Sequence, residues 1–192
     1  IKGPFSVRYG NTFAGVINMV SQYGNPSEKA FVGSFSSGYE SNSNSLVTIL
    51  QLSSNWKKFD IVGDLSYRNY GNYKDGNQNE IPSSFNSKGY GLKMGYQFSE
   101  NQRLQVNVRQ NFGRDVLHAG LPMDTDEDNS SIASLDYSSK SNAVFYKGVT
   151  AKVYYSYVDH IMSNYSRPSF VNSAAIAKVN ATTFGGKVET EW

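Results

Sequence analysis

Repeated alternation of apolar and polar residues constrains the fold of this 192-residue chain more than any other feature. Between residues 59 and 68 most positions of one alternate set are apolar or aromatic, and most of the other set are charged or hydroxylated. The first set is Phe59, Ile61, Leu65 and Tyr67, and the second is Asp60, Asp64, Ser66 and Arg68. Successive side chains of a β-strand point to opposite faces, so this period of two predicts strands with one apolar and one polar face.

Eight segments carry enough of this alternation to be predicted as strands. They lie near residues 29–40, 45–53, 57–73, 87–98, 102–114, 130–139, 147–162 and 178–191. In a soluble antiparallel sheet the apolar face is turned toward a core. Here the polar faces carry charges and the apolar faces end in aromatic residues, which favours a membrane barrel. We therefore predict an all-β fold that forms a sector of a transmembrane antiparallel β-barrel.

The spacing of aromatic residues agrees with the thickness of a membrane. Phe59 and Tyr67 are eight residues apart on one face, which is about 26 Å along a strand at ~3.3 Å per residue. A tilt of ~40° projects this length to about 20 Å, close to the ~25 Å apolar band between two aromatic girdles. The expected girdle residues are Trp56, Phe59, Tyr96 and Phe98 at one rim, and Tyr67, Tyr90 and Tyr157 at the other.

The links between the predicted strands alternate in length. Those at 54–56, 99–101 and 140–146 are short, whereas those at 74–86, 115–129 and 163–177 are long and rich in Asn, Ser, Asp and Gly. The link near 41–44 is a brief exception on the long-loop side. Short turns on one side and long loops on the other are typical of outer-membrane barrels, whose long loops face outward.

Composition excludes several other classes of protein. The sequence contains no run of ~18 apolar residues, which excludes a transmembrane helix. The net charge of +2 is spread evenly, so nucleic acid is not expected as a partner. The absence of cysteine removes disulfides and thiolate metal sites. With two histidines and no nucleophile-elbow motif, we do not expect an enzyme.

A long gapped motif occupies the first part of the chain. It reads GPFSVRYGNTFAGVINMVS and begins at Gly3. The motif resembles the closing segment of the plug domain in TonB-dependent outer-membrane receptors, with Ala14 in place of the first glycine of the usual pair and Ser21 in place of a threonine. The matching positions with a structural role are Gly3, Pro4, Ser6, Tyr9, Gly10, Gly15 and Asn18.

This resemblance implies how the chain is organised and what it does. Residues 1–24 are expected to be the C-terminal end of a plug domain, and residues 25–192 the first eight or so strands of the barrel. The signal sequence, the TonB-contacting segment and most of the plug are then expected upstream. The implied function is active uptake of a small metal ion or metal chelate across the bacterial outer membrane. The implied partners are outer-membrane lipid and the TonB–ExbB–ExbD complex, with no permanently bound cofactor.

The pair His160 and Met162 is the first candidate for ligand binding. Residues two apart on a strand share a face, and the phase from Lys152 and Tyr154 turns this face toward the lumen. An imidazole beside a thioether suits a soft ion such as copper(I). The surrounding stretch 155–167 also resembles the copper-receptor branch of the family, in which a His-x-Met pair contributes ligands. Copper is thus placed slightly ahead of an iron siderophore, and the alternative is a water-bonded histidine with methionine as filler.

A second candidate lies in the long link after the fifth strand. The stretch from His118 to Asp124 is similar to the GLPMD segment of the family's third outer loop. His118, Met123 and Asp124 are therefore outer-loop candidates for passing a metal inward, and a structural Gly-Pro turn is the alternative. Asp124, Asp126 and Asp128 are expected to form a solvated acidic loop, because Asn129 and Leu135 do not fit a calcium loop.

Two other folds also accommodate the alternation. One is a complete eight-stranded barrel with a structural or adhesion role, since eight strands can close on themselves. The other is a soluble carbohydrate-binding β-sandwich, in which Tyr90, Leu92, Met94 and Tyr96 would be buried.

Overall fold

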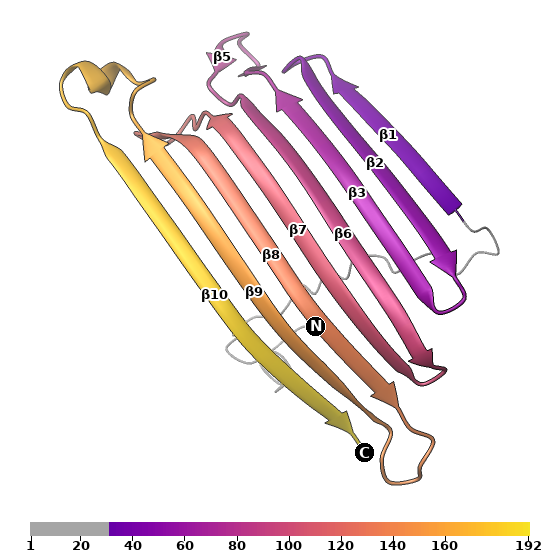
Figure 1. Ribbon diagram of the computed structural model, residues 1–192. Helices are drawn as coiled ribbons and strands as arrows, with labels where there is room; N and C mark the ends of the chain where they lie inside the picture. Colours follow the sequence, from indigo (N-terminus) through magenta and orange to yellow (C-terminus); the bar gives the residue numbers. More distant parts are fainter. Residues whose placement is uncertain (1–30) are drawn as a thin grey trace.

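A computed structural model describes residues 31–192, which form one eight-stranded antiparallel sheet (Figure 1). Its strands are β1 (Phe31–Glu40), β2 (Ser45–Trp56), β3 (Phe59–Tyr70), β6 (Phe85–Ser99), β7 (Gln102–Val116), β8 (Asp124–Lys140), β9 (Gly148–Ser163) and β10 (Ile176–Glu191). A small hairpin of β4 (Tyr73–Lys74) and β5 (Glu80–Ile81) follows β3, and a 3-10 turn, η2 (Pro168–Val171), follows β9. Each strand of the large sheet pairs with its neighbour in the chain, so the topology is a meander. The all-β prediction is confirmed.

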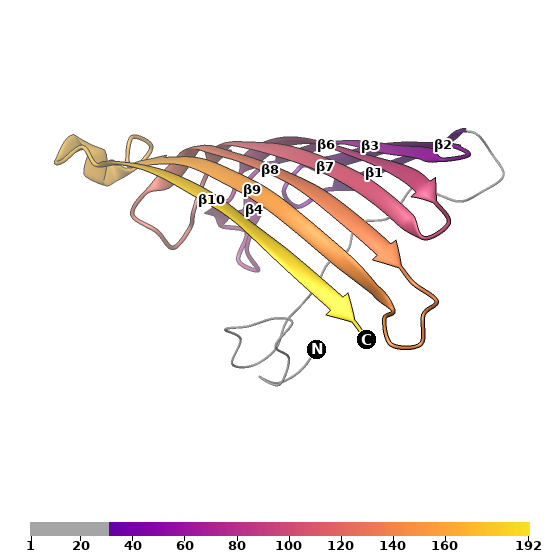
Figure 2. The same ribbon diagram turned by 60° about the horizontal axis from the view of Figure 1, so that its bottom comes forward.

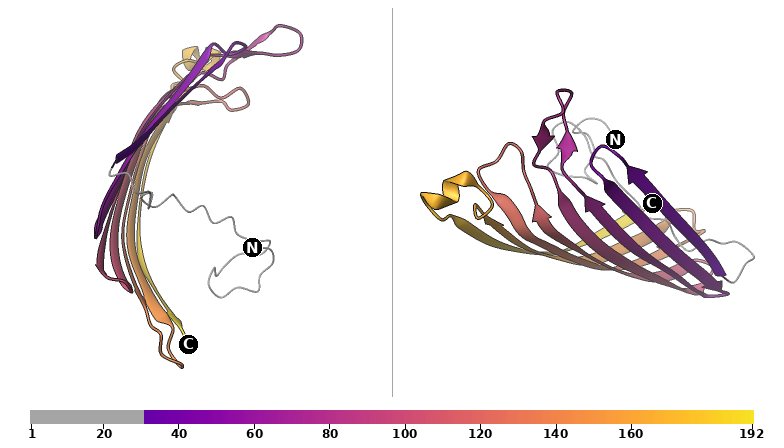
Figure 3. Two further views of the ribbon diagram at one scale, coloured as in Figure 1. Left: turned by 90° about the vertical axis from the view of Figure 1, so that its right-hand side faces the viewer. Right: turned by 90° about the horizontal axis from the view of Figure 1, so that it is seen from above.

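The sheet is long and curved, with a convex and a concave face (Figures 2 and 3). The segments 41–44, 71–84, 117–123 and 164–175 lie at one end, which we call the loop end. The segments 57–58, 100–101 and 141–147 lie at the opposite turn end. The predicted asymmetry is present at 71–84 and 164–175, whereas 117–123 is no longer than the turn-end segment 141–147 because β8 begins at Asp124.

No helix within residues 31–192 is long and apolar enough to cross a membrane.

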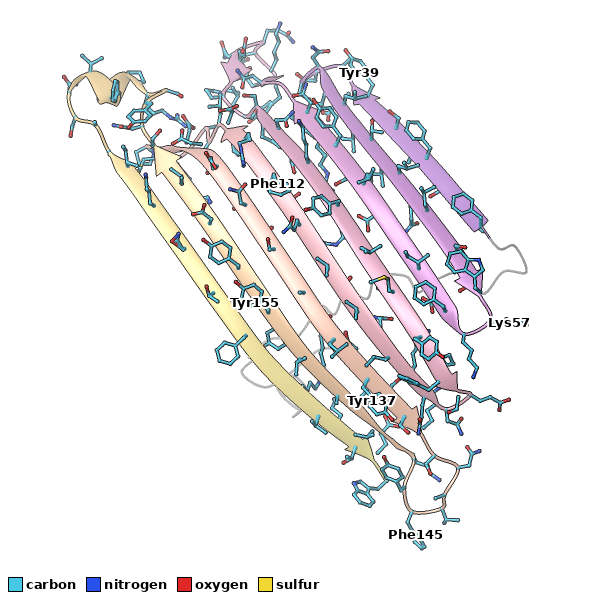
Figure 4. All side chains as sticks on the ribbon, in the orientation of Figure 1. Tyr39, Lys57, Phe112, Tyr137, Phe145 and Tyr155 are labelled. Atoms are coloured by element: carbon cyan, nitrogen blue, oxygen red, sulfur yellow. The ribbon has the colours of Figure 1, made fainter. Side chains whose placement is uncertain are left out.

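The strand register gathers the apolar positions on the convex face. Trp56, Phe59 and Tyr96 are neighbours on adjacent strands near the turn end, and Trp56 stacks on Phe59 with ring centroids 5.8 Å apart. Further along, Leu65 and Tyr90 are cross-strand partners. Figure 4 looks onto this face and labels Phe112, Tyr137 and Tyr155 on it. The girdle residues predicted from the sequence thus gather near the two ends of this face, with Tyr67 one row closer to the loop end than Tyr90 and Tyr157.

The convex face is uncovered. Val62 is the only buried hydrophobic residue among the described residues, whereas Leu65 and Val153 are each 56% exposed. A soluble sandwich would pack a second sheet against these side chains, and residues 31–192 form none. The sheet is also open, with β1 and β10 at its two edges. The sandwich and the closed eight-stranded barrel are therefore not the structures that this segment adopts.

Charge is distributed differently on the two faces. The convex strand positions carry five charged residues, all in the last two rows at the loop end: Lys88, Arg114, Glu127, Asp159 and Lys178. The concave face carries charges along its whole length and pairs many of them. Examples are Lys152 with Asp136 at 3.0 Å and Arg109 with Asp64 at 2.6 Å.

Two of the concave ion pairs pass over a glycine of β6. Arg109 on β7 reaches Asp64 on β3 across Gly91, and Arg103 reaches Asp60 across Gly95 with two contacts of 2.6 and 3.0 Å. A Cβ atom at Gly91 would lie 2.6 Å from Asp64 Oδ1 and 2.7 Å from Arg109 Nη2. Any side chain at these positions would stand between the partners. Glycine at these two positions therefore allows the ion pairs to cross β6.

The acidic segment before β8 differs from the sequence prediction. β8 begins at Asp124 and not near residue 130, so Asp124, Asp126 and Asp128 belong to a strand and not to a solvated loop. Aspartate and asparagine disfavour strands on average, but cross-strand pairs override this preference. Asp128 faces His160 on β9, and a β-bulge between Thr125 and Glu127 accommodates the crowded start of the strand.

Candidate metal-ligand site

His160 and Met162 lie near the loop end of β9. His160 belongs to a register row with Ser87, Gly113 and Asp128. This row is on the concave face, because Ser87 is two positions from Gly89 and four from Gly91 on β6, where the ion pairs cross. Met162 is two residues further along β9 and faces the same way. Both donors therefore project from the polar face, as their spacing predicts.

Asp128 lies beside the imidazole of His160. The His160 Nδ1 atom lies 3.4 Å from Asp128 Oδ1, and the histidine side chain remains 32% exposed. Carboxylates commonly stand behind metal-ligating histidines, on the side of the ring away from the metal. The His160 side chain is thus accessible and has a neighbour of the kind that such histidines commonly have.

His118 comes to the same end of the sheet from the segment 117–123. Its Nε2 atom is 3.0 Å from the hydroxyl of Thr125. Thr125 is the register partner of Met162. One buried threonine, which is 2% exposed, therefore contacts the loop histidine through its hydroxyl and pairs with the strand methionine in the register of the sheet.

A network around Asp124 fixes the His118 segment. The Asp124 Oδ1 atom accepts a hydrogen bond of 2.9 Å from the His118 backbone N–H and pairs with the Arg167 guanidinium. Arg167 also donates to the His118 carbonyl at 2.6 Å. Because Arg167 comes from the segment after β9, these bonds join two loops. His118 therefore has defined surroundings.

The remaining predicted residues have other places. Asp124 is the first residue of β8 and not a loop residue, and it is 4% exposed with its carboxylate engaged by Arg167. Met123 is half-buried at the end of the segment 117–123. Residues 31–192 contain no group of three or more His, Asp, Glu or Cys residues arranged to hold a metal ion. The predicted plug-motif residues lie outside the described residues: Gly3, Pro4, Ser6, Tyr9, Gly10, Gly15 and Asn18.

Sequence reasoning did not single out Thr125 or Arg167 and assigned Asp128 to a loop. Asp128 is 32 residues from His160 in the chain, and only the register of β8 against β9 makes them neighbours. Arg167 lies in a long link whose path no local pattern predicts. The one available signal was the run of alternating aspartates from 124 to 128, which has the period of a strand.

Comparison with known proteins establishes the fold. The chain is similar to a solved structure of the copper transporter OprC, with a TM-score of 0.88 and 23% sequence identity. The similarity covers 99% of this chain and 30% of that transporter, so the chain spans less than a third of its length. No protein family and no curated protein matches the chain. At this identity the similarity shows that residues of this chain adopt the same curved antiparallel sheet as part of that transporter.

Proposed function

We propose that this chain is part of a TonB-dependent outer-membrane receptor that imports a metal ion, and that copper is its cargo. The observation that carries the membrane location is the uncovered apolar convex face, bounded by aromatic rows and free of charge except at the loop end. Such a band opposite a polar interior is what a barrel wall in lipid requires. The similarity in fold to a copper transporter supports this interpretation.

The choice of copper rests on the donors at the loop end. His160 and Met162 share the concave face, and His118 stands beside the register partner of Met162. Imidazole and thioether donors suit copper(I), whereas hard cations prefer oxygen ligands. We propose that His118 meets the ion first and that Met162 and His160 receive it. The remaining ligands would come from the plug, whose end we assign to residues 1–24.

Energy for this transport would come from the TonB–ExbB–ExbD complex, acting on the plug from the turn end. The concave wall contributes a fixed surface, because its charges are paired across strands. Paired charges do not compete strongly for a passing cation. The ion would therefore meet imidazole and thioether side chains, as opposed to paired charges, chiefly at the loop end.

Copper retention by the full-length receptor that contains this chain tests the proposal. The variant His160→Ala/Met162→Leu is expected to lose copper(I) during gel filtration, while the natural receptor retains it. Met94→Leu is the matched control, because Met94 lies on the convex face beside Val106 and Ile61. Full retention by the double variant would rule out the pair as ligands.

Uptake by cells separates the copper proposal from the siderophore alternative. Cells carrying the double variant are expected to accumulate less copper and to take up iron siderophores as before. Deleting the TonB gene is expected to abolish copper accumulation through the natural receptor. Loss of siderophore uptake with normal copper accumulation would assign the site to an iron chelate instead.

A further inference from the structure

We infer that the convex face carries a binding site for one molecule of the phosphorylated glycolipid that forms the outer leaflet of such membranes. The site consists of an apolar notch at Gly63 and of the ammonium group of Lys88 above it. This inference rests on the proposed outer-membrane location. It concerns the outer wall of the barrel and does not involve the metal donors.

The notch is a depression of about 250 Å³ between β2, β3 and β6. Its walls are the side chains of Leu50, Leu52, Leu65 and Tyr90, and its floor is the backbone around Gly63 and Gly91. The Tyr90 ring is held in place, because its hydroxyl donates to Gln110 Oε1 and its centroid is 6.1 Å from that of Phe112. The depression thus has one wall that further contacts hold in place and an apolar lining of the kind that suits an acyl chain.

Nothing in the surrounding structure requires glycine at position 63. A Cβ atom there would meet only the Gly91 carbonyl oxygen at 3.9 Å, an ordinary contact distance. At Gly91, by contrast, a Cβ atom would collide with Asp64 and Arg109 at 2.6 and 2.7 Å. Glycine inside a strand weakens it and often marks a place where a ligand approaches the backbone. Crowding therefore does not explain the glycine at position 63, whereas an acyl chain lying against the backbone there would require it.

Lys88 supplies the charge that an anionic headgroup needs. Among the described strand positions on the convex face of β1, β2, β3 and β6, Lys88 is the only charged residue. It lies two residues from Tyr90 on the same face, about 6.6 Å along the strand. It is exposed and has no acidic partner within residues 31–192. Basic residues at this level attract lipid phosphates.

Among the charged residues at this end of the convex face, Lys88 is the main candidate to contact the lipid phosphate. Arg114 on β7 is held by Asn129 at 2.6 Å and by Glu127 at 3.6 Å. Asp159 on β9 and Lys178 on β10 lie further along the same rim. A lipid with its phosphate at Lys88 and one acyl chain in the notch would point its tail from the loop end toward the turn end. This is the direction required of a lipid in the leaflet on the loop side.

Native mass spectrometry of the full-length receptor in detergent tests the inference, with lipid A and phosphatidylglycerol as probes. Lys88→Gln is expected to weaken lipid A binding about fivefold, since one basic residue near a lipid surface contributes that much. Gly63→Leu is expected to fill the notch and lower binding further. Lys178→Gln is the control on the same rim, and it is expected to bind as the natural receptor does.

Each outcome decides the question. Equal lipid A binding by all three variants would overturn the inference, and equal affinity for phosphatidylglycerol would overturn the choice of lipid. Gly63→Ala and Lys88→Gln leave the strand geometry unchanged, so their results stand even where Gly63→Leu misfolds. Copper retention and membrane fractionation are measured in parallel. A receptor that is absent from the outer membrane contradicts the proposed function, whereas one that is present but indifferent to Lys88 and Gly63 contradicts only this inference.

Discussion

Glycine serves opposite purposes on the two faces of this sheet. On the concave face, Gly91 and Gly95 remove side chains that would separate ion pairs reaching across β6. On the convex face, Gly63 leaves a depression among leucines although a side chain would fit there. Ion pairs within the protein therefore account for the glycines of the concave face, whereas the surroundings of the protein account for the glycine of the convex face. The same substitution made on each of the two faces tests this difference.

The largest effect is expected from a charge placed on the convex face. Leu92→Arg puts a guanidinium in the middle of the apolar band. A charged side chain there lowers the free energy of unfolding of a barrel in lipid by about 2–4 kcal/mol. Ser156→Arg on the concave face of β9 is the matched change and is expected to cost far less, because its side chain reaches water or paired charges. The measurement is unfolding of the full-length receptor by urea in lipid vesicles. Equal costs at both sites would mean that the convex face is not in lipid.

A side chain placed between the partners of a concave ion pair is expected to lower the free energy of unfolding by somewhat less than Leu92→Arg does. Gly95→Val would separate Asp60 from Arg103, whose side chains are 11% and 22% exposed. Leaving such a pair unsatisfied costs about 2–3 kcal/mol once partial exposure is discounted. Gly63→Val, the same change on the convex face, is expected to be neutral or stabilising because valine favours strands. The two variants are compared in the same urea titration, and a destabilised Gly63→Val with an unchanged Gly95→Val would reverse the assignment of the two faces.

The sequence predicted the strands of this sheet well because alternation is a local property. Phe59 to Arg68 alternates except at Val62 and Gly63, and β3 lies where the pattern placed it. The segment from Asp124 to Asn129 was assigned to a loop because its residues disfavour strands individually. Partners such as His160 and Arg167 stabilise this segment, and they are too distant in the sequence for a local pattern to include them. The roles of Gly91 and Gly63 were equally hidden, since both depend on which residues stand on the adjacent strands.

The candidate metal ligands offer a smaller contrast between the faces. Asp128 on the concave face lies 3.4 Å from His160 Nδ1, whereas Asp159 on the convex face accepts a hydrogen bond from Asn180 at 3.2 Å. Asp128→Asn is expected to lower copper affinity about tenfold, because carboxylates behind ligating histidines contribute that much or more. Asp159→Asn is expected to have no effect. Isothermal titration of the full-length receptor measures both, and equal affinities for all three proteins would remove Asp128 from the site.

The smallest effect concerns a carboxylate that belongs to neither face. Asp75, in the turn between β4 and β5, has its pKa lowered below its usual 3.8 by the side-chain amide of Asn79, with further bonds from the backbone N–H groups of Asn79 and Asn77. A depressed pKa means that the turn gains stability from the ionised group above about pH 3.8 and loses it as the pH falls through the lower folded value. Hydrogen exchange of residues 71–84 in the full-length receptor is therefore expected to rise, after correction for intrinsic rates, only below pH 3.8. In Asp75→Asn the protection should not change across that range, and a variant that keeps the natural pH dependence would assign it to another group. Because Asp75 stands in a surface turn and remains in contact with solvent, its contribution to the stability of the turn is small.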